Sequence, residues 1–126
     1  MKPLLIALVL LSNVVVHGSS AQPAATKVIE ITAERFEFFP AEITIDQGED
    51  VELRITSEDT VHGFRIVGGG VSVAVPKRGR GAAVAKFSAT TPGRYRFECH
   101  RMCGAGHNFM RGTIIVRAQS TGAAAK

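Results

Sequence analysis

Four side chains that can bind a soft metal gather in one short stretch near the end of the chain. They are two thiols, an imidazole and a thioether, in the pattern Cys99-x3-Cys103-x3-His107-x2-Met110. Magnesium and calcium prefer oxygen ligands, whereas this mixture of sulfur and nitrogen favours copper. The residue types and their spacing therefore predict a copper site between residues 99 and 110.

A fifth candidate ligand, His62, lies well upstream of this stretch. It shares the alternation parity of Phe64 and Ile66, and side chains of one parity lie on one face of a strand. A lone inward-facing histidine is more often a hydrogen-bonded core residue than a metal ligand. The ligand-rich stretch downstream reverses this preference, so the predicted site includes His62.

The segments that would position these ligands alternate apolar and polar residues with a period of two, which is typical of half-buried strands. The alternation is clear in residues 36–38, 43–46, 51–56 and 94–98. Residues 43–46 and 51–56 flank a turn signal and predict a strand pair joined by a tight connection. No segment between residues 27 and 117 keeps a helical period, so we predict an all-β sandwich.

The first residues predict an export signal. A positive charge at Lys2 precedes the apolar run of residues 4–16, and small residues follow it, ending at Ala21. This pattern is typical of a secretory signal peptide, and the run is shorter than the roughly 20 residues of a membrane-spanning anchor. We therefore expect a signal peptide at 1–21, a linker at 22–26, one domain at 27–118 and a flexible tail at 119–126.

The expected location is outside the cytoplasm, periplasmic or extracellular, with no membrane span once the signal peptide is removed. Two cysteines in an oxidising compartment would ordinarily predict a disulfide, but the neighbouring imidazole and thioether favour metal binding. The formal net charge of +4 gives a weak preference for acidic partners. Nucleic acid is not an expected partner, because no nucleic-acid motif accompanies the charge and export removes the opportunity.

The cysteine-rich pattern, together with the upstream histidine, resembles the dinuclear copper A (CuA) motif of cytochrome c oxidase subunit II and nitrous oxide reductase. Asp59-Thr60-Val61-His62-Gly63-Phe64 is similar to that family's strand carrying aspartate, histidine and phenylalanine. Met110-Arg111-Gly112 resembles the segment that leads to its last strand. The likeness covers roughly residues 28–117 and implies a cupredoxin-like Greek-key β-sandwich.

The resemblance also implies a set of ligands for two copper ions and a role in passing single electrons. Both cysteines would bridge the two ions, each histidine would bind one ion, and the methionine would be a weak ligand. A backbone carbonyl two residues after the first cysteine would complete the set. The implied ligands are His62, Cys99, the carbonyl of Arg101, Cys103, His107 and Met110. Met102 and Phe109 would restrict water around them or serve as ordinary packing residues.

Three features depart from an oxidase subunit II. Arg101 stands where that family has a glutamate that helps to bind magnesium, and the chain has no tryptophan. The pair of membrane-spanning helices of subunit II is also missing. We therefore expect a free-standing electron carrier rather than an enzyme, with a partner such as a c-type cytochrome, a terminal oxidase or a reductase. His100, where the oxidase family has serine, is expected to be exposed.

Three alternatives remain at this point. A mononuclear blue-copper carrier would use His62, Cys103, His107 and Met110, and would leave Cys99 without a role. A copper-delivery or copper-buffering protein would bind Cu(I) reversibly through the same soft ligands. A structural zinc site would use both cysteines and both histidines, but it would leave Met110 idle because zinc does not favour a thioether.

Overall fold

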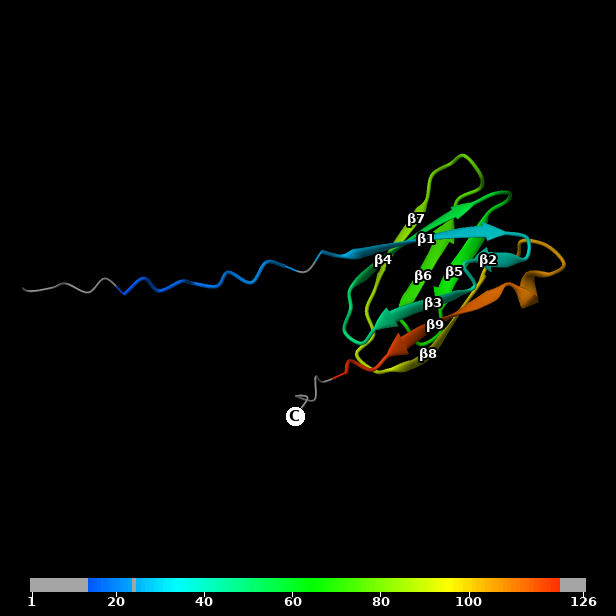
Figure 1. Ribbon diagram of the computed structural model, residues 1–126. Coiled ribbons are helices and arrows are strands. Elements are labelled where there is room, and N and C mark those ends of the chain that lie inside the picture. Colours follow the sequence, from blue (N-terminus) through cyan, green and yellow to red (C-terminus); the bar gives the residue numbers. More distant parts are fainter. Residues whose placement is uncertain (1–13, 24, 121–126) are drawn as a thin grey trace, which may run out of the picture.

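The structure, a computed structural model, describes residues 14–23 and 25–120 (Figure 1). Most of the expected signal peptide and the end of the expected tail lie outside these residues. In the described part, the strands are β1 (Lys27–Glu34), β2 (Glu37–Phe39), β3 (Glu42–Asp46), β4 (Val51–Ser57), β5 (His62–Ile66), β6 (Val71–Val75), β7 (Ala83–Phe87), β8 (Gly93–Glu98) and β9 (Arg111–Arg117), with the 3-10 helix η1 (His107–Phe109) before the last strand.

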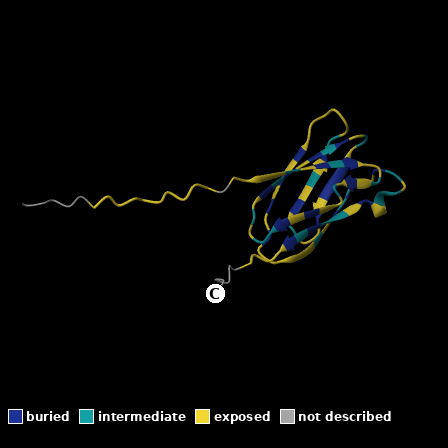
Figure 2. Cartoon of the chain, in the orientation of Figure 1, coloured by how far each residue is buried: buried dark blue, intermediate teal, exposed yellow. Residues whose placement is uncertain are grey.

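The strands form two sheets packed face to face. One sheet has the order β2-β1-β4-β7 and the other has the order β3-β9-β8-β5-β6. The pairs β1/β4 and β3/β9 are parallel, and the remaining pairs are antiparallel. Alternate residues along the strands are buried, so the buried positions line the interior between the sheets (Figure 2). The prediction of an all-β sandwich is confirmed.

The predicted pairing of residues 43–46 with 51–56 is wrong. Strand β3 pairs with β9, whereas β4 pairs with β1 and β7 in the opposite sheet. The turn between them is bonded to other segments, because the amide of Gln47 donates to Arg117 O at 2.8 Å and that of Gly48 donates to Ala89 O at 2.8 Å. A period of two satisfies either sheet equally well, so alternation predicts strands but not their partners.

Aromatic side chains from both sheets meet in the centre of the core. The ring of Phe38 lies edge-on to Phe64 and Phe97, with centroids 5.6 and 5.4 Å away. On β5, Phe64 lies two residues after His62. On β8, Phe97 lies two residues before Cys99, which directly follows the strand. All four face inward, so the buried faces of these two strands run directly from the aromatic core to the predicted ligands.

Replacing Gly112 with alanine is expected to destabilise the metal-free protein by about 2 kcal/mol, because overpacking of a core costs roughly 1–3 kcal/mol. A Cβ at this position would lie 2.5 Å from the backbone oxygen of Ala41 and would clash with the buried ring of Phe97. Urea unfolding would measure the change. Ser72→Ala, at an exposed position of the same sheet, is the control and should change stability by less than about 0.5 kcal/mol. Equal midpoints for the two variants would contradict the prediction.

Candidate metal centre

One end of the five-stranded sheet carries every predicted ligand. His62 is the first residue of β5, and Cys99 directly follows β8. The ligand loop, residues 99–110, then passes through η1 and leads into β9 at that end of the sandwich (Figure 1). Its two ends are tied together because the amide of Cys99 donates to Met110 O at 3.0 Å. Strand β5 pairs with β8 through Arg65 and Glu98, which brings the upstream histidine to the loop.

The predicted donor atoms converge. Cys99 Sγ lies 3.8 Å from Cys103 Sγ, 4.0 Å from His62 Nδ1 and 3.1 Å from Arg101 O. Cys103 Sγ lies 3.7 Å from His107 Nδ1 and 3.8 Å from Met110 Sδ. Donors of this kind bind metals at about 2.0–2.3 Å, so two donors on one ion can be at most roughly 4.6 Å apart. These spacings therefore fit a soft metal.

The donors form two groups joined by the pair of sulfurs. Cys99 lies beside His62 and the Arg101 carbonyl, while Cys103 lies beside His107 and Met110. Both cysteines are free and buried, His62 is 0% exposed and Met110 is 1% exposed. His107 is only half-buried. The imidazole of His107 is thus the side chain of the donor set that reaches nearest to solvent.

Asp59 orients the imidazole of His62. Its Oδ1 accepts a hydrogen bond of 2.6 Å from His62 Nε2, so Nδ1 keeps its lone pair toward the sulfurs. Partial burial raises the pKa of Asp59, but hydrogen bonds from His62, Arg35 and Thr60 outweigh it and lower the pKa to about 2. The carboxylate is therefore ionised at neutral pH. The sequence placed Asp59 in the motif, but only the fold assigns it this contact.

The environment of Cys103 keeps its thiol protonated in the metal-free protein. Burial, followed by the neighbouring Cys99 thiol, raises the pKa of Cys103 to about 11. A thiol must lose its proton to bind a metal. Metal binding at Cys103 would therefore release a proton. Burial disfavours the charged thiolate, and a bound cation would stabilise it.

The expectation that His100 is exposed is wrong. His100 is not fully exposed: its ring lies over Gly63, where a Cβ would be 2.5 Å from His100 Nδ1, and this nitrogen has no hydrogen-bond partner among the described residues. Burial, then the charges of Arg65 and Arg101, lower the pKa of His100. A glycine on the neighbouring strand leaves the space that the ring fills.

Met102 and Phe109 do not shield the ligands, because they are 78% and 73% exposed. Phe36 covers the loop instead, with its ring packed against Gly104 and Gly106. The sequence pattern placed Phe36 on a strand and gave no sign of this contact, because Phe36 precedes the loop by more than sixty residues. Shielding of the loop thus comes from the other sheet.

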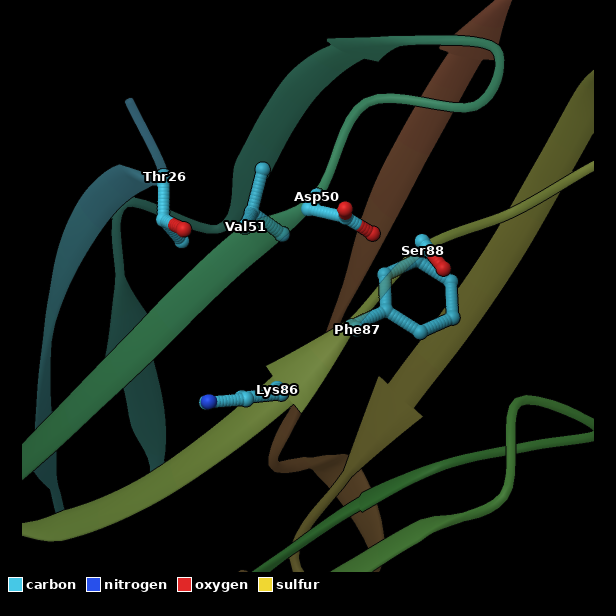
Figure 3. Close-up of a pocket in the computed structure, with 6 residues that line it drawn as sticks. All are labelled: Thr26, Asp50, Val51, Lys86, Phe87 and Ser88. Carbon is cyan, nitrogen blue, oxygen red and sulfur yellow. The ribbon is translucent and has the colours of Figure 1, made fainter. Parts of the chain in front are cut away.

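The hollow shown in Figure 3 lies at the Val51 end of β4, and its residues offer no competing metal site. It measures about 280 Å³, and its lining contains no sulfur and no imidazole. The residues around it are Thr26, Asp50, Val51, Lys86, Phe87 and Ser88.

A family model described as a cupredoxin-like domain matches residues 4–116. The chain belongs to this cupredoxin-like family. It is also homologous to cytochrome c oxidase subunit 2 of Thermus thermophilus, with 36% identity over 110 residues that cover 80% of this chain and 79% of the relative. The predicted family and the cupredoxin-like fold are confirmed, and membership implies copper-binding electron transfer.

Two solved structures resemble the chain. One is a chain of a heme-copper terminal oxidase dimer, with 32% identity and a TM-score of 0.66 over 75% of this chain and 67% of that chain. The other is the periplasmic domain of subunit II of cytochrome oxidase (CoxB) of Bradyrhizobium japonicum, with a TM-score of 0.67 over 77% of this chain and 88% of that chain. At 20% identity the second likeness shows the fold alone.

No helix in the described part of the chain has the length and hydropathy needed to span a bilayer. The relatives are subunits of an enzyme, so the expectation that this chain is not itself an enzyme stays a prediction.

Proposed function

We propose that this protein is an exported carrier of single electrons that holds a dinuclear CuA-type copper centre. The observation that carries the proposal is the paired arrangement of the donors: two sulfurs 3.8 Å apart, each with an imidazole nitrogen of its own within 4.0 Å. Two copper ions bridged by two thiolates would supply one-electron chemistry with little rearrangement, because the charge is spread over four atoms.

The chain's own residues make three contributions to this function. Cys99 and Cys103 would hold the centre with their thiolates, and His62 and His107 would each supply an imidazole nitrogen to it. Met110 and the Arg101 carbonyl complete the two groups. Burial of His62, both thiols and Met110 excludes water, and the paired strands β5, β8 and β9 hold the donors in position before any metal arrives. Such preorganisation limits the rearrangement that accompanies electron transfer.

The partners proposed for this carrier are other redox proteins, such as a c-type cytochrome, a terminal oxidase or a reductase. Support comes from the homology to an oxidase subunit II. The half-buried imidazole of His107 offers electrons a path from the donors toward the surface. The apolar start of the sequence and these relatives also support export.

Copper stoichiometry and electron paramagnetic resonance test this proposal. The reduced, purified protein should bind two copper ions per chain, and the oxidised form should show one unpaired electron shared equally by two copper nuclei. A single copper with its signal confined to one nucleus would instead indicate a mononuclear blue-copper carrier.

A kinetic experiment separates electron transfer from copper delivery. The loaded protein should exchange electrons with a small redox protein while its copper content stays constant. Transfer of copper to a metal-free acceptor faster than any electron exchange would contradict the carrier function and favour delivery.

A further inference from the structure

All the proposed ligands come from the five-stranded sheet or from the loop between two of its strands. Arg35 belongs to the other sheet, at the corner between β1 and β2, and this corner lies beside the ligand loop (Figure 1). From the contacts of this residue we propose that Arg35 is a positioning residue of the metal centre, which holds both groups of donors in register. The inference rests on the proposed function.

Arg35 contacts both sides of the centre. Its side-chain Nε donates a hydrogen bond of 2.6 Å to the carbonyl oxygen of Cys103. Its backbone amide donates to Asp59 Oδ2 at 3.0 Å, and the other oxygen of that carboxylate holds His62 Nε2 at 2.6 Å. A hydrogen bond from a charged donor is stronger than a neutral one. One residue therefore links the loop cysteine to the support of the upstream histidine.

The part of the loop that Arg35 holds has little other support. Among the described residues, backbone-to-backbone hydrogen bonds tie Cys99 to Met110 and connect residues 104, 106, 107, 109 and 110, but none involves residues 101–103. A segment without such bonds opens easily. Besides the contact of Cys99 Sγ with the Arg101 carbonyl at 3.1 Å, the bond from Arg35 to the Cys103 carbonyl is thus a hydrogen bond that restrains this segment.

The loop backbone can approach the corner that carries Arg35 and Phe36 because Gly104 has no side chain. A Cβ on Gly104 would lie 2.8 Å from the ring of Phe36 and 3.5 Å from Arg35 Nε. The backbone of Gly104 also has a φ of 146°, a conformation that favours glycine. The corner and the loop are therefore packed against each other as a matched pair, and the hydrogen bond of Arg35 is not an isolated surface contact.

Arg35 also differs from the other arginines that bond to side chains on the surface. In the part of the chain that the structure describes, Arg54, Arg65, Arg78, Arg94, Arg96 and Arg117 each lie within 4.0 Å of a carboxylate oxygen, whereas the Arg35 side chain has no such ion pair. Its guanidinium charge is directed to a backbone carbonyl of the ligand loop. A positive charge beside the centre destabilises the oxidised, more positive form relative to the reduced form, so removal of this charge should lower the reduction potential.

Arg35→Ala is expected to lower the Cu(I) affinity by roughly 10- to 100-fold, the usual effect of losing a partner that orients a ligand. In the metal-free protein, the amides of residues 102–106 should exchange with solvent faster. Arg35→Lys keeps the charge but loses the planar donor, so it should retain the potential of the wild type and share the faster exchange. Arg54→Ala, which removes an exposed arginine of β4 that pairs with Glu52 and does not contact the ligand loop, is the control and should change none of these quantities.

The measurements are Cu(I) competition with a chelator, amide hydrogen exchange of the metal-free chain and the reduction potential of the loaded protein. The inference is wrong if Arg35→Ala, folded as judged by circular dichroism, matches Arg54→Ala in both affinity and loop exchange. Hydrogen exchange needs no copper, so it tests the hold of Arg35 on the loop even if the wild type fails to bind two copper ions. That failure would overturn the proposed function alone.

Discussion

Cys103→Ser should abolish the copper centre, whereas Cys99→Ser should leave a protein that binds a single copper ion. The difference follows from the contacts of the two sulfurs. Without Cys99, the sulfur of Cys103 still lies 3.7 Å from His107 Nδ1 and 3.8 Å from Met110 Sδ, and a donor nitrogen of His62 lies within 4.8 Å, which gives the thiolate, two imidazoles and thioether of a mononuclear site. Without Cys103, the remaining thiol has only His62 and a carbonyl oxygen beside it.

Copper analysis and visible and electron paramagnetic resonance spectra of the two variants would test this asymmetry. Serine is close to cysteine in size, and unfolding of the metal-free variants would show that the fold is kept. Retention of two copper ions by Cys103→Ser would contradict the bridging role. Identical spectra of the two variants would contradict the division of the donors into two groups.

His107→Ala should weaken copper binding far more than Met110→Leu. An imidazole is a strong ligand, and its loss should exceed the roughly 10- to 100-fold cost of losing a residue that merely orients a ligand. A thioether is a weak ligand, so Met110→Leu should keep two copper ions and shift the reduction potential. Copper titration and potentiometry would measure both effects.

The methionine variant carries its own control for packing. Met110 is 1% exposed, and a change of methionine to leucine at a buried site conserves volume and usually costs less than about 1.5 kcal/mol. Altered copper binding in a well-folded Met110→Leu protein would therefore report on the ligand. Equal loss of copper from both variants would contradict the weak-ligand role given to Met110.

The strands and most of the centre could be predicted because their signals are local. Alternation marks each strand through the burial of its own side chains, as in β4, whose odd-numbered positions are all buried. The downstream donors belong to one loop between paired strands, so chain connectivity alone keeps Cys99, Cys103, His107 and Met110 near one another. The assignment of these residues as copper ligands stays a prediction until copper is measured.

The pairing of strands and the contacts between the two sheets could not be predicted from local sequence signals. The residues after β3 lead into the opposite sheet, although a period of two fits either sheet, and the predicted strand pair was therefore wrong. Neither role expected for Met102 and Phe109, restricting water or ordinary packing, fits their exposure. A loop side chain has no periodicity that shows which way it faces. Phe36 provides that cover from the other sheet.

Residue types and spacing thus established the kind of chemistry, since thiolate, imidazole and thioether donors on one loop suit copper wherever that loop lies in the fold. The tertiary structure alone decided how the donors are held. Packing of the two sheets brings Arg35 to a carbonyl 68 positions along the chain and joins it to Asp59 and His62. The physical reason is that ligand chemistry belongs to individual side chains, whereas their orientation depends on hydrogen bonds between segments that meet only after the sandwich has closed.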